Sequence, residues 1–136
     1  FTYSFRLPGY ITRIDDEIYI NLNLDRSLSN QIIDIEKRKL PVDHEYLYED
    51  TFINMLNLPT GSTTSFIPEP VEYKHKKFGF KIHYELTESY VKQYKNIYIN
   101  TIMLSPADFK SWNEMIAQLN DAYREAIILK TGSNKL

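Results

Sequence analysis

Histidine and carboxylate side chains lie close together at two places in the sequence, and such groups can bind a metal ion. His44 stands between Asp43 and Glu45, and His83 stands two residues before Glu85. Adjacent side chains in a strand point to opposite faces, so the first group rarely converges on one ion, and a solvated start of a strand is expected there. The second pair would share one face, but zinc would need a third ligand from a neighbouring strand. We therefore interpret His83 as part of an exposed cross-strand pair.

Two further charged clusters fit surface positions better than ligand sites. His75 is surrounded by Lys74, Lys76 and Lys77, whose ammonium groups disfavour a bound cation. The acids Asp15–Glu17 could attract calcium, but calcium loops supply more than three ligands. A soluble hairpin turn is the preferred interpretation of that stretch.

Three tyrosines form the one candidate binding row. Tyr90, Tyr94 and Tyr98 are spaced four residues apart, so in a strand they share one face. Carbohydrate-binding modules use such rows as platforms, whereas strand tyrosines more often pack as a ladder with their hydroxyls in water. The row is a hypothetical site for a glycan or a peptide, and a peptide could also pair with an exposed sheet edge.

The sequence contains no motif of a catalytic or cofactor site. It has no nucleophile elbow, no Gly-rich phosphate loop and no HExxH sequence, and only 4 glycines. It has no Cys, which removes disulfides, thiolate metal sites and a Cys nucleophile. We therefore expect no catalytic residue, no metal ligand and no cofactor.

Composition is that of a globular chain without electrostatic attraction to nucleic acid. Hydrophobic residues make up 43% of the 136 residues, and the formal net charge is -2. The basic run Lys37–Lys39 is offset by Asp34, Glu36 and Asp43. The sequence contains no run of 18 apolar residues, which is the length that a membrane-spanning helix requires. The chain begins at Phe1 without a signal peptide, so a fragment or a processed protein is expected.

The elements that would position these residues are mostly strands. Alternating apolar residues and turn signals predict strands over 10–14, 18–24, 46–58, 63–67, 71–76, 80–86 and 91–104. The run 46–58 exceeds the usual strand length, which predicts a bend or bulge near Glu49–Asp50. A hairpin turn is predicted at Lys77–Gly79, and 31–39 is expected to be irregular.

A single helix is predicted near the C-terminus. Ser105 suits an N-cap, Pro106 suits the first helical position, and Asp108 complements the helix dipole. The apolar stripe that follows has spacings of three and four, contains Trp112 as its expected anchor, and predicts a helix over about 105–121. A short final strand over 126–129 completes a mostly β fold, an antiparallel β-sandwich with one C-terminal helix.

Three parts of the chain are expected. Residues 1–35 would form a leading segment of short strands, and 36–131 would form the β-sandwich domain. The polar run before Leu40 and Pro41 would mark the boundary, because proline favours extended geometry in the residue before it. Residues 132–136 would form a frayed tail.

Three stretches carry a resemblance to a known family: EKRKLPVDHEY, EDTFINMLNLPTG and LSPADFKSWNEMIAQLNDAYREAIILK. Together with the strands around Lys77–Phe80, they resemble the C-terminal domain of bacterial transglutaminase-like proteins that begin with a domain of unknown function. The shared features are Arg38 to Pro41 before a strand, the turn Leu58–Gly61, the Ser-Pro helix and the ending Ile127–Lys130. The resemblance covers about 36–131.

The resemblance implies a context and no reaction. Members of this family look secreted or associated with the cell envelope, often in Bacteroidetes-type bacteria, and their Cys-His-Asp triad lies in the transglutaminase core. This chain has no Cys, so no catalytic residue carries over. The implied function is a non-catalytic accessory domain that packs against or positions a core in the same polypeptide. Residues 1–35 would be the connection after that core, and the implied location is extracytoplasmic.

Overall fold

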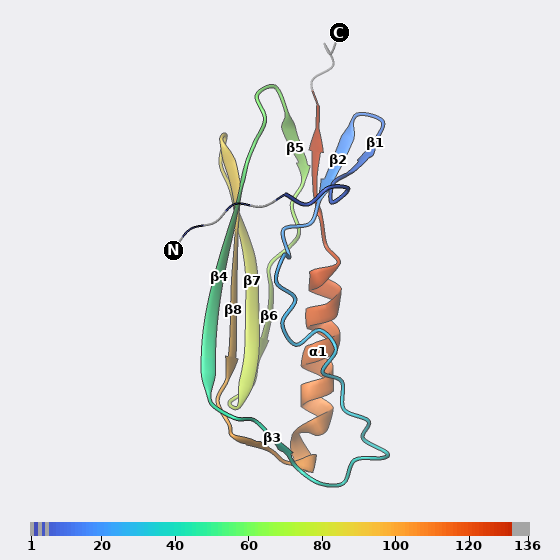
Figure 1. The fold of residues 1–136 in the computed structure, drawn as a ribbon, viewed down its shortest axis with the longest axis vertical. Coiled ribbons are helices and arrows are strands. Elements are labelled where there is room, and N and C mark those ends of the chain that lie inside the picture. The colour runs from blue at the N-terminus through green and yellow to red at the C-terminus, as the bar shows by residue number, and fades with distance from the viewer. Residues whose placement is uncertain (1, 3, 5, 132–136) are drawn as a thin grey trace.

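The computed structural model describes residues 2, 4 and 6–131, whose strands form three antiparallel sheets beside one C-terminal helix (Figure 1). The long sheet has the order β4-β8-β7-β6, with β4 (Tyr48–Asn57), β8 (Tyr90–Ile99), β7 (Phe78–Leu86) and β6 (Val71–Lys74). The small sheet has the order β1-β2-β10-β5, with β1 (Thr12–Ile14), β2 (Glu17–Ile20), β10 (Ile127–Lys130) and β5 (Thr63–Phe66). Strands β3 (Val42–Asp43) and β9 (Met103–Leu104) form a separate pair. The predicted mostly β class is confirmed.

The helix begins where the sequence predicts it. A 3₁₀ turn, η1 (Pro106–Asp108), leads into α1 (Phe109–Tyr123). The Ser105 hydroxyl donates a hydrogen bond to the Asp108 carboxylate over 2.9 Å, and Lys77 forms an ion pair with that carboxylate over 2.7 Å. The Ser105 N–H also donates to that carboxylate over 3.3 Å, which pairs a backbone donor at the start of the helix and fixes the first turn. The helix ends at Tyr123, two residues beyond the predicted end.

The helix and the small sheet lie in line along one face of the long sheet, since α1 continues directly towards β10 (Figure 1). The apolar stripe of α1 packs on the half of that face that contains Phe78, Phe80, Ile97 and Ile99. A second cluster joins the small sheet to the other half of the long sheet through Ile18, Ile20, Leu22, Val91, Ile127 and Leu129. Both hydrophobic clusters therefore pack against the same face of the long sheet.

The connection over 21–33, called the strap from here on, runs beside the helix and is held by side chains. The side-chain amide of Asn21 donates to the Tyr123 carbonyl over 2.8 Å. At the other end of the helix, Asn113 exchanges two hydrogen bonds of 2.8 Å with the backbone of Ile33. The strap thus supplies partners for carbonyls at the helix C-terminus, which a helix cannot pair internally.

Several predicted boundaries are corrected by the register of the strands. No bulge occurs near Glu49–Asp50, because β4 pairs with β8 without interruption along all ten of its residues. The turn predicted at Lys77–Gly79 lies earlier, and Phe78 and Gly79 belong to β7. The run 91–104 is divided into β8 and β9, and the run 18–24 is paired only to Ile20.

The leading segment and the last strand share one sheet, since β2 pairs with β10 from Glu17 to Ile20. The stretch 31–39 is irregular, as predicted. The boundary near residue 35 stays a prediction. The predicted tail, 132–136, lies outside the described residues.

Trp112 is confirmed as a buried residue of the helix stripe, with 2% of its surface exposed. Its ring meets Phe78 edge-on at 5.2 Å, and its indole nitrogen donates to the Gln31 carbonyl over 2.6 Å. Trp112→Ala should therefore lower the free energy of unfolding by about 3–5 kcal/mol, measured by urea denaturation. Trp112→Phe is the control that keeps ring packing and loses the hydrogen bond, and it should cost less. An unchanged stability of Trp112→Ala would show that the helix is not docked on this tryptophan.

Candidate functional site

The outer face of the long sheet is the side away from α1, and it carries the tyrosine row. Along β8, buried residues alternate with half-buried ones, so Val91, Ile97 and Ile99 face the core. Tyr90, Tyr94 and Tyr98 lie at the alternate positions, on the outer face. The structure therefore places the three predicted residues in one row, spaced by roughly 13 Å along the strand.

The hydroxyls of two of these tyrosines are occupied by a neighbour on β7. Tyr90 donates to Glu85 over 3.2 Å, and Tyr94 donates to the same carboxylate over 3.4 Å. The Tyr94 ring stacks on His83 with centroids 4.8 Å apart, and the ammonium of Lys92 lies 5.4 Å from the Tyr90 ring centroid. These side chains stabilise one another across the two strands, as cross-strand pairs do.

Tyr98 lies across the opposite end of the same face. It is paired with Gly79, and a Cβ atom at Gly79 would stand 2.5 Å from the Tyr98 hydroxyl. Glycine therefore makes room for the ring to lie flat over β7. The Tyr98 hydroxyl donates to the carbonyl of His75 over 2.5 Å and accepts from its N–H over 3.3 Å, which ties the ring to the β6–β7 turn.

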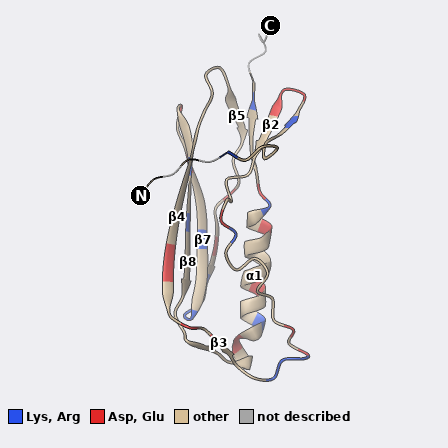
Figure 2. Ribbon diagram, viewed as in Figure 1, with Lys and Arg blue, Asp and Glu red and all other residues tan. Residues whose placement is uncertain are grey.

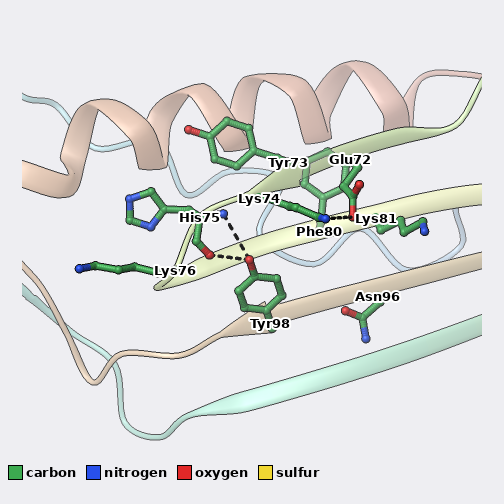
Figure 3. A pocket seen from close by; sticks show the side chains of 9 residues that line it. All are labelled: Glu72, Tyr73, Lys74, His75, Lys76, Phe80, Lys81, Asn96 and Tyr98. Carbon is green, nitrogen blue, oxygen red and sulfur yellow. Dashed lines mark hydrogen bonds and ion pairs between the residues drawn. The ribbon is translucent and has the colours of Figure 1, made fainter.

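An open groove of about 510 Å³ lies beside Tyr98, lined by Glu72, Tyr73, Lys74, His75, Lys76, Phe80, Lys81, Asn96 and Tyr98 (Figure 3). Lys74 is turned toward Glu72, at 4.0 Å. Figure 3 shows Lys76 and Lys81 extending toward opposite ends of the groove. The polar groups do not converge on one point, so the groove lacks the arrangement of a specific small-molecule site.

The remainder of the outer face mixes apolar and charged side chains. On β4, Ile53 and Met55 are 57% and 52% exposed. They lie beside Tyr94 and Lys92 on β8. Figure 2 shows that acidic residues colour one stretch of β4, whereas lysines occur on β7 and β8. The face is therefore amphipathic and has no dominant sign of charge.

The histidines His44 and His83 pack against aromatic rings. Asp43 and Glu45 are exposed, as expected of a solvated start of a strand, whereas His44 between them is half-buried with its ring 5.6 Å from that of Trp112. Burial lowers the pKa of His44, and the nearby Asp43 opposes that change. The cross-strand pairing predicted for His83 is confirmed by its stack on Tyr94. Among the residues that the structure describes, no three His, Asp or Glu side chains form a metal-binding group.

Sequence reasoning missed one buried cation on the inner face of the sheet. Lys95 is 1% exposed, and its ammonium contacts the Asp25 carboxylate at 2.9 Å and the Asp25 carbonyl at 2.6 Å. Its Nζ lies 3.2 Å from the Tyr123 hydroxyl and 4.4 Å from the Phe52 ring centroid. Lys95 thus ties the strap to the central strand.

Both members of this ion pair have shifted pKa values. Burial lowers the pKa of Lys95, and the hydrogen bond and charge of Asp25 partly oppose that change. Burial would raise the pKa of Asp25, but hydrogen bonds from Ser27 and Lys95 outweigh it and lower the pKa. Burial also raises the pKa of Tyr123, so its hydroxyl stays protonated and donates to the Ser27 carbonyl over 2.8 Å. Perturbed groups often mark active sites, but Lys95 and Tyr123 are buried beneath the strap, to which Asp25 itself belongs.

A signal for Lys95 was present in the sequence. Once Tyr90, Tyr94 and Tyr98 are assigned to the outer face, the odd-numbered residues must face the core, and Gln93 and Lys95 are among them. Gln93 is also fully buried, and its amide donates to Asn23 on the strap over 2.8 Å. Polar residues at core positions predict partners from another element, although the sequence does not say which.

Removal of Asp25 should leave the buried ammonium of Lys95 without its countercharge. Asp25→Ala is expected to lower the free energy of unfolding at pH 7 by about 1.5–3 kcal/mol. Because folding lowers the pKa of Asp25 from 3.8, its contribution is complete above that value and is lost as the pH falls through the folded pKa. The difference between wild type and variant should therefore shrink below about pH 4, measured by urea denaturation across pH.

Lys95→Met is the matched control for this pair. It removes the ammonium and leaves Asp25 with a side chain that is 41% exposed, so it should cost less than Asp25→Ala. A larger loss for Lys95→Met, or a loss for Asp25→Ala that persists unchanged at pH 3, would contradict this role of the pair.

Comparison with known proteins gives one match. Residues 16–129 match the model of DUF3858, which is described as a domain of unknown function with a solved structure. No curated protein and no solved structure matches the chain in the other two comparisons. None of the helices in the described part of the chain is both long and apolar enough to cross a membrane. Because the matched span covers most of its length, this chain belongs to the DUF3858 family of domains.

Proposed function

We propose that this chain is a non-catalytic accessory domain that packs against, or positions, a transglutaminase-like core in the same polypeptide. The observation that carries the proposal is the outer face of the long sheet. No described residue outside the sheet forms a layer on it, whereas α1 and the small sheet cover the inner face. An uncovered sheet face that carries exposed Ile53 and Met55 is suited to contact with another domain.

The mixture of side chains on this face supports a domain contact. Interfaces between domains of one chain are more polar than obligate subunit interfaces. The face combines the apolar Ile53 and Met55 with the aromatic Tyr94 and the charged Lys92 and Glu85. The opposite charges of Lys92 and Glu85 can pair with complementary charges on a partner domain. They do not add up to the strong positive field that would attract nucleic acid.

The setting of the proposal comes from the resemblance described above. It implies a bacterial protein of the Bacteroidetes type, located in the periplasm or the cell envelope, with the catalytic triad in the preceding core. Membership in a domain family of unknown function is compatible with this setting.

The proposal is tested by labelling single cysteines, because the chain has none of its own. Lys92→Cys places a thiol between Tyr90 and Tyr94 on the outer face, and Glu69→Cys places one in an exposed loop. Each variant is made in the isolated chain and in the complete polypeptide, and modification is followed by peptide mass spectrometry. We expect the Lys92→Cys thiol to react at least about tenfold more slowly in the complete polypeptide, which corresponds to about 1.4 kcal/mol of protection.

Glu69→Cys is the matched control and should react equally in both contexts. Equal reactivity of Lys92→Cys in the two contexts would contradict packing through this face. The turnover number of the core should also be unchanged by Glu85→Gln. A loss of turnover in a folded Glu85→Gln protein would contradict the non-catalytic role.

A second candidate function is a glycan- or peptide-binding module that uses the tyrosine row. The specific observation in its favour is that Tyr90, Tyr94 and Tyr98 all lie half-buried on the open face, and Tyr98 lines the groove of Figure 3. If this function holds, the isolated chain binds a glycan or peptide array above background, and Tyr94→Ala abolishes the binding. Their occupied hydroxyls favour the accessory role, since a platform needs free ring faces and free polar groups.

A further inference from the structure

Strand β4 is an edge strand with a free side. It pairs with β8 along its whole length, and among residues 2, 4 and 6–131 no strand pairs with its other side. Figure 1 shows β4 at the outer margin of the long sheet. A free edge of ten residues is a template for pairing with another strand.

The hydrogen-bonding groups that face the free side can be assigned. Leu58 donates its N–H to the Ser89 carbonyl over 2.8 Å, in line with the register of the two strands. In an antiparallel pair of strands, residues that exchange backbone hydrogen bonds with the neighbouring strand alternate with residues that do not. Since Leu58 bonds to the β8 side, the even-numbered residues of β4 direct their N–H and C=O groups to β8. The odd-numbered residues, from Glu49 to Asn57, direct theirs to the free side.

β4 has few of the features that usually protect an edge. Beyond Asp50 it contains no charged residue, it has no Pro, and its register has no bulge. The other edges have them: β6 has four residues, follows Pro68 and Pro70 and ends at Lys74. Strand β1 is three residues long and contains Arg13, and β5 has only four residues. The contrast singles out β4 as the edge that is built to be paired.

We propose that β4 pairs with β4 of a second copy of this chain, antiparallel across a two-fold axis at Ile53. In this register Ile53 faces its own counterpart, Thr51 faces Met55, and Glu49 faces Asn57. All three pairings join residues whose backbone groups point to the free side. The pairing adds about ten intermolecular hydrogen bonds and sets the exposed Ile53 and Met55 side chains of the two copies beside one another on the face that they already share.

The charges of β4 select this arrangement over others. Its two charged residues, Glu49 and Asp50, stand together near its start (Figure 2). An in-register parallel pairing would place these acids side by side, which is destabilising. The antiparallel register separates each Asp50 from its counterpart by roughly 20 Å, beyond the screening length in physiological salt. A closed two-fold dimer is also the commonest symmetry of homo-oligomers.

This inference does not depend on the proposed function. Edge pairing extends the long sheet sideways into eight strands and leaves its outer face free for another domain. The two surfaces can therefore be tested with different residues, Lys92 on the face and Ile53 on the edge.

Cross-linking by single cysteines tests the register. Two Ile53→Cys chains would bring their Cα atoms to about 5.5 Å, within the range that a disulfide can bridge. We expect a disulfide-linked dimer under mild oxidation. Asn57→Cys lies on the same strand and face, but the two copies of residue 57 would be roughly 26 Å apart, so this control should not cross-link. Equal cross-linking of the two variants would overturn the register.

Sedimentation equilibrium tests the dimer itself. The wild-type mass should rise from that of one chain to that of two as concentration increases. Ile53→Pro removes an N–H that faces the free side and leaves the ladder to β8 intact, so it should stay monomeric with a nearly unchanged melting temperature. If this variant does not fold, Ile53→Lys places two ammonium groups opposite each other and serves instead. A wild-type monomer up to about 1 mM, or a dimer that persists in the folded variant, would overturn the proposal.

Discussion

The packing of α1 and β10 in line along one face of the long sheet is the constraint on which the rest of the structure depends. As a result, the inner face of β8 contributes side chains to both hydrophobic clusters, and no described helix or second sheet packs on the outer face. Because side chains alternate along a strand, the same packing places Ile97 inside and Tyr98 outside. The tyrosine row and the exposed apolar residues of β4 are therefore consequences of how the core is built.

The strap completes this core with polar contacts. The helix ends without a basic residue in its last turn, and the amides of Asn21 and Asn23 reach its last carbonyls instead. A chain of side chains continues from Asn23 to Gln93 and on to Asn54. Lys95 adds the one buried ammonium among the described residues, held by Asp25. Buried polar groups of this kind are costly unless all of them are paired, so they fix one position of the strap.

Local signals in the sequence were sufficient for the helix and for most of the longer strands. The alternation around Ile82 and the Ser105–Pro106 helix start predicted β7 and α1, because both depend on neighbouring residues. The bulge expected near Glu49–Asp50 was wrong, since β8 is as long as β4 and pairs with all of it. The strand expected up to Leu24 ends at Ile20, because the asparagines that follow bind the helix end. These outcomes depend on partners from distant parts of the chain.

The candidate surface was predictable in part. The shared face of Tyr90, Tyr94 and Tyr98 follows from their spacing, and the structure places them as expected. Their hydrogen bonds to Glu85 and to the His75 backbone depend on the pairing of β8 with β7 and on the β6–β7 turn, which spacing alone does not give. The free edge of β4 also required the sheet order, because any strand in a sequence can be central or peripheral.

The central claim is that the uncovered face of the long sheet is a contact surface for the rest of the polypeptide. The most direct test is an experimental structure of the complete polypeptide that contains this chain. We expect another domain to be seated on the outer face of β8 and β7, with Tyr94 and Lys92 buried between the two domains. A structure in which those side chains remain exposed to solvent, with the neighbouring domain elsewhere, would contradict the claim.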